Sequence, residues 1–332
     1  MHADSKKMTI TPKISRFAKY AWFVLAYNIV VILWGVFLRA SKSGDGCGQH
    51  WVTCHGEFIP SAPELKTIIE FSHRVTSSIA GLLLIVLLIW AIRRWYVSRS
   101  NQNRYAMVAA IGSFIFVVIE GLLGRSLVLT GNTAMTLTPE RPFWMAGHLV
   151  NTFILLAFIT LTGWFATHGR RLNFRLETKY IAIVIFGMFV IIAVGVSGSI
   201  AALASMLFPA ETIGVGIDQD FSPTSNVLLR LRLLHPILSV ITGVFVIFIS
   251  GWLKRESDDD KNVKRWSGIL SGLIVVQLGF GAATLLSLAP IVMQLGHLFL
   301  ADAIWISFVL TAANFMAARP SGSITDSKND LV

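Results

Sequence analysis

The sequence predicts an all-α integral membrane protein whose eight transmembrane helices form two tandem four-helix bundles, a parallel repeat. Three observations support this fold class. The chain is 54% hydrophobic and only 14% charged, a composition unlike that of a soluble domain. Eight apolar runs each exceed the ~20 residues that a membrane-spanning helix needs. Basic residues gather in alternate connections, and motifs of the first half recur in the second.

The eight apolar runs occupy most of the 332 residues and leave no room for a soluble domain. They lie at 18–39, 68–92, 105–129, 143–166, 180–203, 228–253, 266–288 and 291–317. The first run follows a short basic tail and lacks a small-residue cleavage site, so we interpret it as a retained helix. We expect an N-terminal tail (1–17), an N-terminal half (18–166), a linker (167–179), a C-terminal half (180–317) and a C-terminal tail (318–332).

The distribution of Lys and Arg predicts the orientation of these helices. They cluster in the N-terminal tail and in the connections after the second, fourth and sixth runs, whereas residues 204–227 contain none. This is the positive-inside pattern, which predicts a multi-pass protein of the cell (plasma) membrane with both termini cytoplasmic. The formal net charge of +10 is therefore explained by topology, and we expect no nucleic-acid partner.

An internal repeat relates the two halves. Glu120 and Gln277 each lie four residues before a glycine, Gly124 or Gly281. One histidine also stands near the start of the second, fourth, sixth and eighth runs: His73, His148, His235 and His297. Because each unit has four helices, the second unit begins on the same side as the first, so the repeat is parallel. The four histidines should share one layer, about 8 Å below the exoplasmic boundary.

Four intramembrane histidines at matched positions predict a cofactor. A single one is often a packing residue, but polar groups inside a bundle usually mark a functional site. Imidazole is a good iron or copper ligand. Two histidines on neighbouring helices can face each other across a planar macrocycle. We therefore expect iron of one haem between His73 and His148, and of a second between His235 and His297.

Arginines near the expected haem sites favour haem over bare metal ions. Haem carries two propionates, and guanidinium pairs bidentately with carboxylate. Interfacial anchoring by snorkelling side chains is the alternative interpretation. The candidate propionate contacts are Arg74, Arg232, Arg39 and Arg125.

The two predicted haem sites are not equivalent. Glu70 lies three residues before His73 and shares its helical face, whereas Arg232 holds the matching place before His235. A carboxylate beside only one of the two haems suggests that the first site carries out chemistry and that the second holds a bound cofactor. The alternative is that Glu70 forms an ion pair with Arg74 or Arg39.

Several short segments together carry a resemblance to a known family. "EFSHR" opens the second run, "GHL" the fourth, "LLHP" lies in the sixth, "GHLFLADAIW" in the eighth, and "SGSIAALASMLFPA" closes the fifth. This ordered set resembles the haem A synthase family over nearly the whole chain. The resemblance implies an oxidoreductase that oxidises the C8 methyl group of haem O to the formyl group of haem A for terminal oxidases.

The resemblance also implies roles for the two halves. Haem O would be the substrate in the N-terminal half, with Glu70 catalytic, and haem B the bound cofactor between His235 and His297. Implied partners are the enzyme that supplies haem O, terminal oxidase assembly and an electron acceptor that the sequence does not identify; a homo-oligomer stays open. Glu120 stands where the pattern has glutamine, with Arg125 as a candidate partner.

Both cysteines, Cys47 and Cys54, lie in the first outer connection. Thiols on that side oxidise readily, and a spacing of seven in a glycine-bearing loop can reach disulfide geometry. The resemblance points the same way. A metal site with His50 and His55, or free thiols, are the alternatives.

Two other functional classes compete with a synthase. A non-catalytic di-haem b cytochrome in quinone-linked electron transfer would share the four histidines but leave Glu70 unexplained. A transporter would explain the repeat but predicts no haem.

Overall fold

The computed structural model describes residues 14–133, 135–168, 170–173 and 176–318. Most of the two predicted tails, 1–17 and 318–332, and part of the predicted linker therefore lie outside the described residues. Within the described residues the chain forms nine helices and no strand. They are α1 (Arg16–Ala40), α2 (Leu65–Ser98), α3 (Asn101–Leu129), α4 (Arg141–His168), α5 (Thr178–Leu207), α6 (Ile213–Phe221), α7 (Val227–Arg255), α8 (Lys261–Leu286) and α9 (Ile291–Ala318).

Eight of these helices are long and apolar enough to cross a membrane, which confirms the predicted all-α class with eight candidate transmembrane helices. The short helix α6 was not predicted. The Thr212 hydroxyl caps its first turn by accepting from the Val215 amide, and its Asp220 pairs with Arg232 of α7. With nine residues, α6 is too short to span a bilayer.

Capping residues extend two of the helices beyond their apolar runs. Between α2 and α3 the turn has only two residues: Arg99 ends α2 in the left-handed conformation, and Ser100 caps α3 by accepting from the Asn103 amide. This tight connection explains why α2 continues past residue 92 and α3 begins before residue 105.

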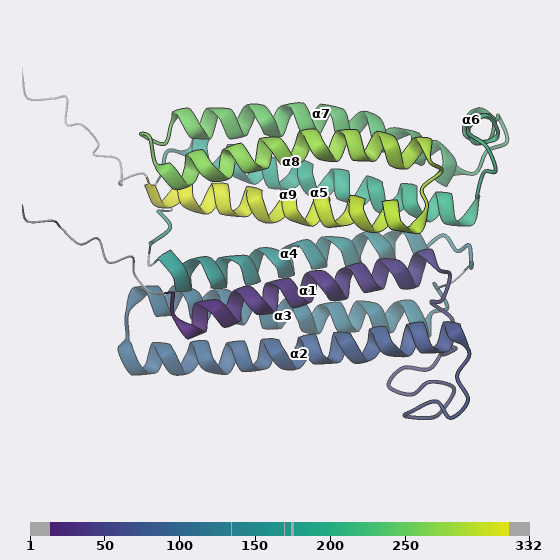
Figure 1. Cartoon of the computed structure of the whole chain (residues 1–332), viewed down its shortest axis with the longest axis horizontal. Coiled ribbons are helices and arrows are strands. Elements are labelled where there is room, and N and C mark those ends of the chain that lie inside the picture. The colour runs from purple at the N-terminus through teal and green to yellow at the C-terminus, as the bar shows by residue number, and fades with distance from the viewer. Residues whose placement is uncertain (1–13, 134, 169, 174–175, 319–332) are drawn as a thin grey trace, which may run out of the picture.

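The long helices form two layers (Figure 1). In one layer α1 packs against α2 and α4, and α3 packs against α2 and α4. In the other, α7 packs against α5 and α8, and α8 packs against α9. Contacts of α4 with α5 and α9, and of α1 with α9, join the layers. Each layer is thus a group of four long helices.

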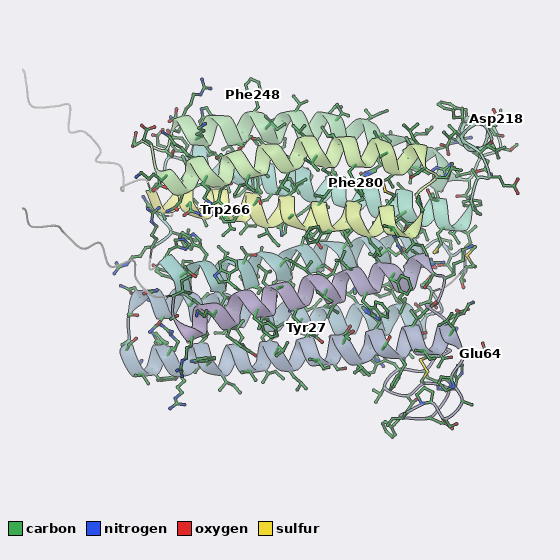
Figure 2. All side chains as sticks on the ribbon, in the orientation of Figure 1. Tyr27, Glu64, Asp218, Phe248, Trp266 and Phe280 are labelled. Atoms are coloured by element: carbon green, nitrogen blue, oxygen red, sulfur yellow. A yellow bond between two sulfur atoms is a disulfide. The ribbon has the colours of Figure 1, made fainter. Side chains whose placement is uncertain are left out.

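Helices α4 and α9 form the centre of the molecule. Their most apolar segments are 72% and 61% buried, against 28% or less in each of the other long helices. Trp305 of α9 stacks on Phe153 of α4, with ring centroids 5.3 Å apart, and donates to the Phe153 carbonyl. The outward faces carry exposed apolar side chains such as Phe248 (Figure 2), as expected of lipid-facing helices.

The two ends of the molecule differ. One end carries the loop 41–64 and α6, and we call it the loop end; Glu64 and Asp218 mark it in Figure 2. The described residues closest to both termini lie at the other end (Figure 1). Because α2, α4, α7 and α9 all begin at the loop end, their histidines lie toward that end.

Candidate functional site

The histidines of α7 and α9 face each other in the second layer. The ring centroids of His235 and His297 are 6.2 Å apart, and the ring planes are 84° apart. His235 Nδ1 is 3.0 Å from the Ser197 hydroxyl oxygen of α5. Both rings are half-buried. The structure thus brings together the second predicted ligand pair.

Each of these two rings packs against a glycine of a neighbouring helix. A Cβ atom on Gly198 of α5 would lie 2.9 Å from His235 Cε1, and one on Gly281 of α8 would lie 3.0 Å from His297 Cε1. Both distances are shorter than an ordinary carbon–carbon contact of about 3.5–4.0 Å. Glycine at these positions therefore leaves the space that the rings occupy.

The first layer repeats part of this arrangement. His73 of α2 packs against Gly35 of α1, where a Cβ atom would lie 3.0 Å from His73 Cε1. Among the described residues, the ring contact that joins His235 and His297 has no counterpart between His73 and His148. Gly124 of α3 differs from its counterpart Gly281, because a Cβ atom there would meet nothing within 4 Å.

The side chain of Glu120 contacts His148. Glu120 Oε1 lies 3.5 Å from His148 Nε2, and the carboxylate accepts 2.5 Å hydrogen bonds from Asn151 Nδ2 and Thr152 Oγ1. The proposed pairing with Arg125 is wrong. Among the described residues, the guanidinium of Arg125 lies over the Trp51 ring, 5.8 Å from its centroid.

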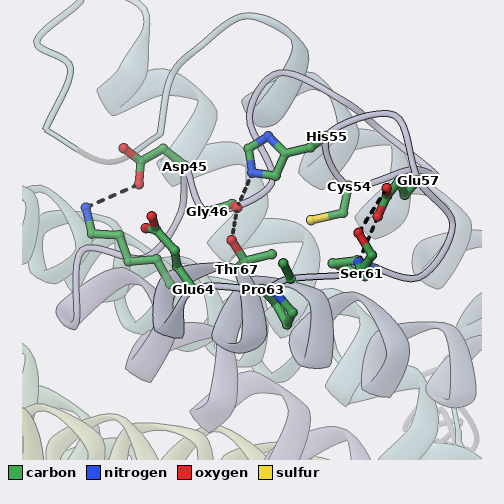
Figure 3. A pocket seen from close by; sticks show the side chains of 12 residues that line it. Asp45, Gly46, Cys54, His55, Glu57, Ser61, Pro63, Glu64 and Thr67 are labelled. Atoms are coloured by element: carbon green, nitrogen blue, oxygen red, sulfur yellow. Dashed lines mark hydrogen bonds and ion pairs between the residues drawn. The ribbon is translucent and has the colours of Figure 1, made fainter.

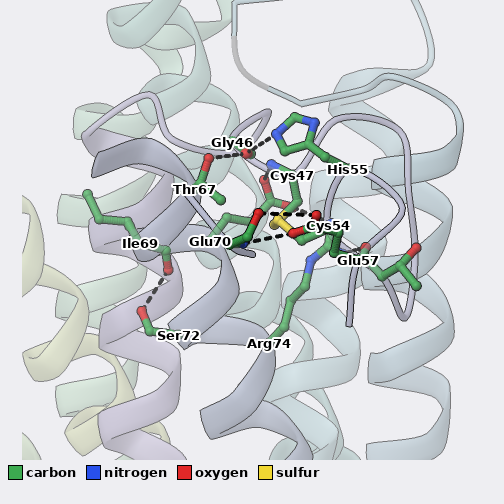
Figure 4. The surroundings of a disulfide bond; sticks show 12 residues. Gly46, Cys47, Cys54, His55, Glu57, Thr67, Ile69, Glu70, Ser72 and Arg74 are labelled. Carbon is green, nitrogen blue, oxygen red and sulfur yellow. Dashed lines mark hydrogen bonds and ion pairs between the residues drawn. A yellow bond between two sulfur atoms is a disulfide. The ribbon is translucent and has the colours of Figure 1, made fainter. Parts of the chain in front are cut away.

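Glu70 is buried at the loop end, with 3% of its surface exposed. Arg74 Nη2 lies 2.5 Å from Glu70 Oε1, and the Cys47 backbone amide donates to Glu70 Oε2 at 2.9 Å (Figure 4). The ion pair with Arg74 that the sequence offered as the alternative is therefore present, and the one with Arg39 is not among the ion pairs of the described residues. Both contacts favour the ionised carboxylate, whereas burial opposes it.

A disulfide joins Cys47 and Cys54, in agreement with the sequence-based expectation. The disulfide loop is pinned to α2, because the Thr67 hydroxyl donates to the Gly46 carbonyl at 2.6 Å and Arg74 donates to the Thr53 carbonyl at 3.0 Å. Neither cysteine is free, and His55 Nε2 is 2.8 Å from the Gly46 carbonyl oxygen. Within the described residues no three His, Cys, Asp or Glu side chains form a metal site, so the alternative site with His50 and His55 is not found.

A hollow of about 490 Å³ opens between the disulfide loop and the start of α2 (Figure 3). Its lining includes Asp45, His55, Glu57, Glu64 and Lys66, and none of the four candidate histidines. The hollow is therefore separate from the histidine pairs.

The four candidate propionate contacts lie toward the loop end, and each has a protein partner. Besides Arg74 and Arg125, these are Arg39, which donates to Gln294 Oε1 of α9 at 3.2 Å, and Arg232, which pairs with Asp220 of α6 at 2.5 Å. The Arg39 contact joins the two layers.

Sequence reasoning missed several polar groups near the histidines. Asp302 of α9 is 1% exposed, and neither carboxylate oxygen has a hydrogen-bond partner in the described part of the chain. Its place within an apolar run was a signal that could have singled it out. Ser197 and Asn151 had no such signal, because their roles depend on which helices are neighbours.

A family model described as cytochrome oxidase assembly protein, COX15-CtaA, matches residues 18–309. The chain is 39% identical over 304 residues to a protein of Thermus thermophilus named protoheme IX farnesyltransferase, covering 92% of this chain and 49% of that protein. It is 28% identical over 305 residues to the heme A synthase of Alkalihalophilus pseudofirmus, covering 88% of this chain and 94% of that protein.

A shorter match is to the heme A synthase of Halalkalibacterium halodurans, 38% identical over 105 residues, which cover 32% of this chain and 34% of that protein. The chain spans about half the length of the Thermus relatives that it matches.

Proposed function

Because this chain belongs to the COX15-CtaA family of cytochrome oxidase assembly proteins, we propose that it is a haem A synthase, which oxidises the C8 methyl group of haem O to the formyl group of haem A. Relatives named heme A synthase support this activity, one of them along almost its whole length. The Thermus relative is named for a farnesyltransferase, but only half of that protein is matched. The observation that carries the proposal is the facing pair His235–His297, with each ring packed against a glycine.

The His235–His297 pair fits a resident haem B. Two imidazoles that bind one metal from opposite sides through bonds of about 2 Å have ring centroids roughly 6 Å apart. The observed separation is 6.2 Å. Bound there, haem B supplies one-electron chemistry at its iron. His73 and His148 are the matching residues for haem O as substrate in the first layer.

Glu70 is the proposed proton acceptor. Conversion of a methyl to a formyl group adds an oxygen atom to the C8 carbon and removes protons and electrons from it, so the reaction needs an oxygen source, an electron acceptor and a base near that edge. Glu70 lies three residues before His73 on α2, and the Cys47 amide would hold its carboxylate in place when Arg74 turns to a propionate. Arg74 and Arg232 are proposed propionate contacts that would exchange their present carboxylate partners, Glu70 and Asp220, for a propionate. Arg39 and Arg125 are the other two candidates.

The proposed setting is the cell membrane, with both termini cytoplasmic and the loop end exoplasmic. The halves 18–166 and 180–317, joined by the linker 167–179, form a parallel repeat. The matched contacts of Gly35 with His73 and of Gly198 with His235 support this relation. Proposed partners are the enzyme that supplies haem O and the assembling terminal oxidase.

The variant Glu70→Gln tests the catalytic role. Glutamine is nearly isosteric but cannot take a proton, so we expect this variant to fold, bind haem B and accumulate haem O or a hydroxylated intermediate with little haem A. Glu64→Gln, at the exposed start of α2, is the matched control and should make haem A normally. Normal haem A from Glu70→Gln would leave Glu70 as a structural partner of Arg74.

Haem content tests the second site. We expect His235→Ala and His297→Ala each to lower the haem B content of the purified protein, whereas His50→Ala in the outer loop should not. Full haem B occupancy in either ligand variant would contradict the assignment. If the wild-type protein binds haem but makes no haem A, the result would instead favour a di-haem cytochrome.

A further inference from the structure

The disulfide loop carries large apolar side chains that no part of the described chain covers. Phe58 and Ile59 are 73% and 78% exposed, and Trp51 and Val52 are exposed as well. Three acidic side chains of the loop line the hollow beside α2, whereas none of these four apolar side chains does. The loop thus separates its acidic groups from its exposed apolar ones.

Hydrogen bonds hold Phe58 and Ile59, which we call the apolar tip, within a closed turn. The Glu57 carboxylate accepts from the Ser61 amide at 2.8 Å and from the Ser61 hydroxyl at 3.2 Å, so the residues on both sides of the tip are joined. At the base of the turn, the backbones of Cys54 and Glu57 exchange hydrogen bonds of 2.7 and 3.0 Å. Because the turn is already ordered, binding through the tip costs little further conformational entropy.

Charged residues of α2 indicate the level of the loop relative to a bilayer. The exposed Arg93, at the end of α2 opposite the loop end, marks one edge of the hydrocarbon layer, because a charge inside that layer is costly. About 20 residues, at about 1.5 Å each, cross the layer, so the other edge falls near Arg74. The Arg74 guanidinium donates to the Thr53 carbonyl at 3.0 Å, which places Thr53 within one arginine side chain of that edge.

Helix α3 indicates the same level independently. A count of about 20 residues from the exposed Arg104 leads to Gly124 and Arg125. The Arg125 guanidinium lies over the Trp51 ring, 5.8 Å from its centroid. Tryptophan is also typical of the interface between membrane and water. The segment 51–53 therefore lies at the edge of the hydrocarbon layer, and the base of the turn that carries the apolar tip follows it directly.

The loop lies beside the bundle and not only beyond its end (Figure 1). It runs next to the first turns of α2, on the side that faces away from the second layer. Farther along α2, Val75, Ile79 and Leu82 are exposed, as expected of a helix that faces lipid. The apolar tip therefore stands next to the space that lipid fills around α2.

We propose that the apolar tip is a membrane anchor: Phe58 and Ile59 enter the interfacial region of the leaflet at the loop end, with Trp51 at the level of the headgroups. Apolar side chains gain free energy when they leave water, and the acidic side chains of the loop remain at the hollow. The anchor does not depend on haem binding. It bears on the site because the same loop supplies the Cys47 amide that donates to Glu70.

Spin labelling of the full-length protein in phosphatidylcholine nanodiscs tests the anchor. Both cysteines of the chain are in the disulfide, so Ile59→Cys introduces the one thiol that a nitroxide can label. Oxygen concentrates in the hydrocarbon layer and a nickel chelate stays in water, so the ratio of their collision rates with the label reports its depth. Val86→Cys, on the exposed face of α2, is the control inside the bilayer. Glu64→Cys, about 15 Å beyond Arg74 along α2, is the control in water.

We expect the oxygen-to-nickel ratio at position 59 to exceed the ratio at 64 and to approach the ratio at 86. Phe58→Cys gives a second reading from the same tip, with the same expectation. A label at 59 that meets the nickel chelate as often as the label at 64 would overturn the proposal. A label that meets neither reagent would overturn it too, because protein, from a second copy or a partner, would then cover the tip. Neither reading depends on haem content, so the anchor and the proposed synthase activity are tested separately.

Discussion

The substitution Gly198→Ala tests whether α5 positions the ring of His235. The added Cβ atom would lie 2.9 Å from His235 Cε1 and 3.4 Å from both ring nitrogens. Ordinary contacts between carbon atoms are about 3.5–4.0 Å, so the ring must move by roughly 0.5–1 Å. The backbone itself has no reason to change, because alanine is favoured over glycine inside a helix by about 1 kcal/mol.

Two costs accompany this movement of the ring. Leaving its rotamer costs about 0.5–1.5 kcal/mol. The hydrogen bond between His235 Nδ1 and Ser197, 3.0 Å long and made on the same helix as the new methyl group, has a net value of about 0.5–1.5 kcal/mol. Together they amount to about 1–3 kcal/mol, which corresponds to roughly 5- to 150-fold weaker haem B binding at the second pair.

The assay is an optical titration of the purified protein with haem B, together with thermal unfolding followed by circular dichroism. Gly279→Ala is the control, because a Cβ atom there would meet nothing within 4 Å. We expect Gly198→Ala to bind haem B more weakly while the haem-free protein still unfolds cooperatively, with the gain in helix propensity offsetting part of the cost of moving the ring. Wild-type affinity in a folded Gly198→Ala protein would refute the assigned role of this glycine.

Three further outcomes are expected. Replacing Cys47 and Cys54 by serine should lower the free energy of unfolding by about 2 kcal/mol and leave some haem A synthesis, whereas complete loss of turnover in a folded variant would favour a redox role. Burial raises the pKa of Asp260, but bonds from the first amides of α8 and from Arg170 outweigh it and hold the pKa below its usual value. The stabilisation from Asp260 should therefore be present at neutral pH and be lost as the pH falls through that lowered pKa. The difference in melting temperature between wild type and Asp260→Ala should shrink in acid, and a difference that stays unchanged would contradict this. Asp302→Asn should not lower the unfolding midpoint, because a neutral amide replaces a buried carboxyl whose oxygens have no hydrogen-bond partner in the described part of the chain; a large fall would reveal such a partner.

Hydropathy and periodicity predicted the long helices because a bilayer imposes a length and a composition on each of them. They could not predict α6. Its nine residues are stabilised by the Thr212 cap and by the pair of Asp220 with Arg232, which depends on how the chain returns to α7. Helix ends were also displaced where capping residues such as Ser100 lie outside the apolar run.

For the site, the sequence could predict only features of each helix by itself. The four histidines stand near the starts of their helices, so their place toward one end could be predicted, whereas their contacts with Glu120, Ser197 and the glycines depend on which helices are neighbours. The error over Arg125 has a simple cause. Residues three or four apart share a helical face, but Arg125 follows Glu120 by five. The two side chains therefore leave the helix in different directions, and Arg125 contacts Trp51.

The most direct test of the proposed activity is the haem content of cells that make haem O but no haem A. The full-length chain is expressed in such cells, and the extracted haems are separated and identified by mass. We predict that haem A appears with the wild-type chain and is nearly absent with Glu70→Gln. Extracts that contain haem B and haem O but no haem A with the wild-type chain would contradict the proposed oxidation.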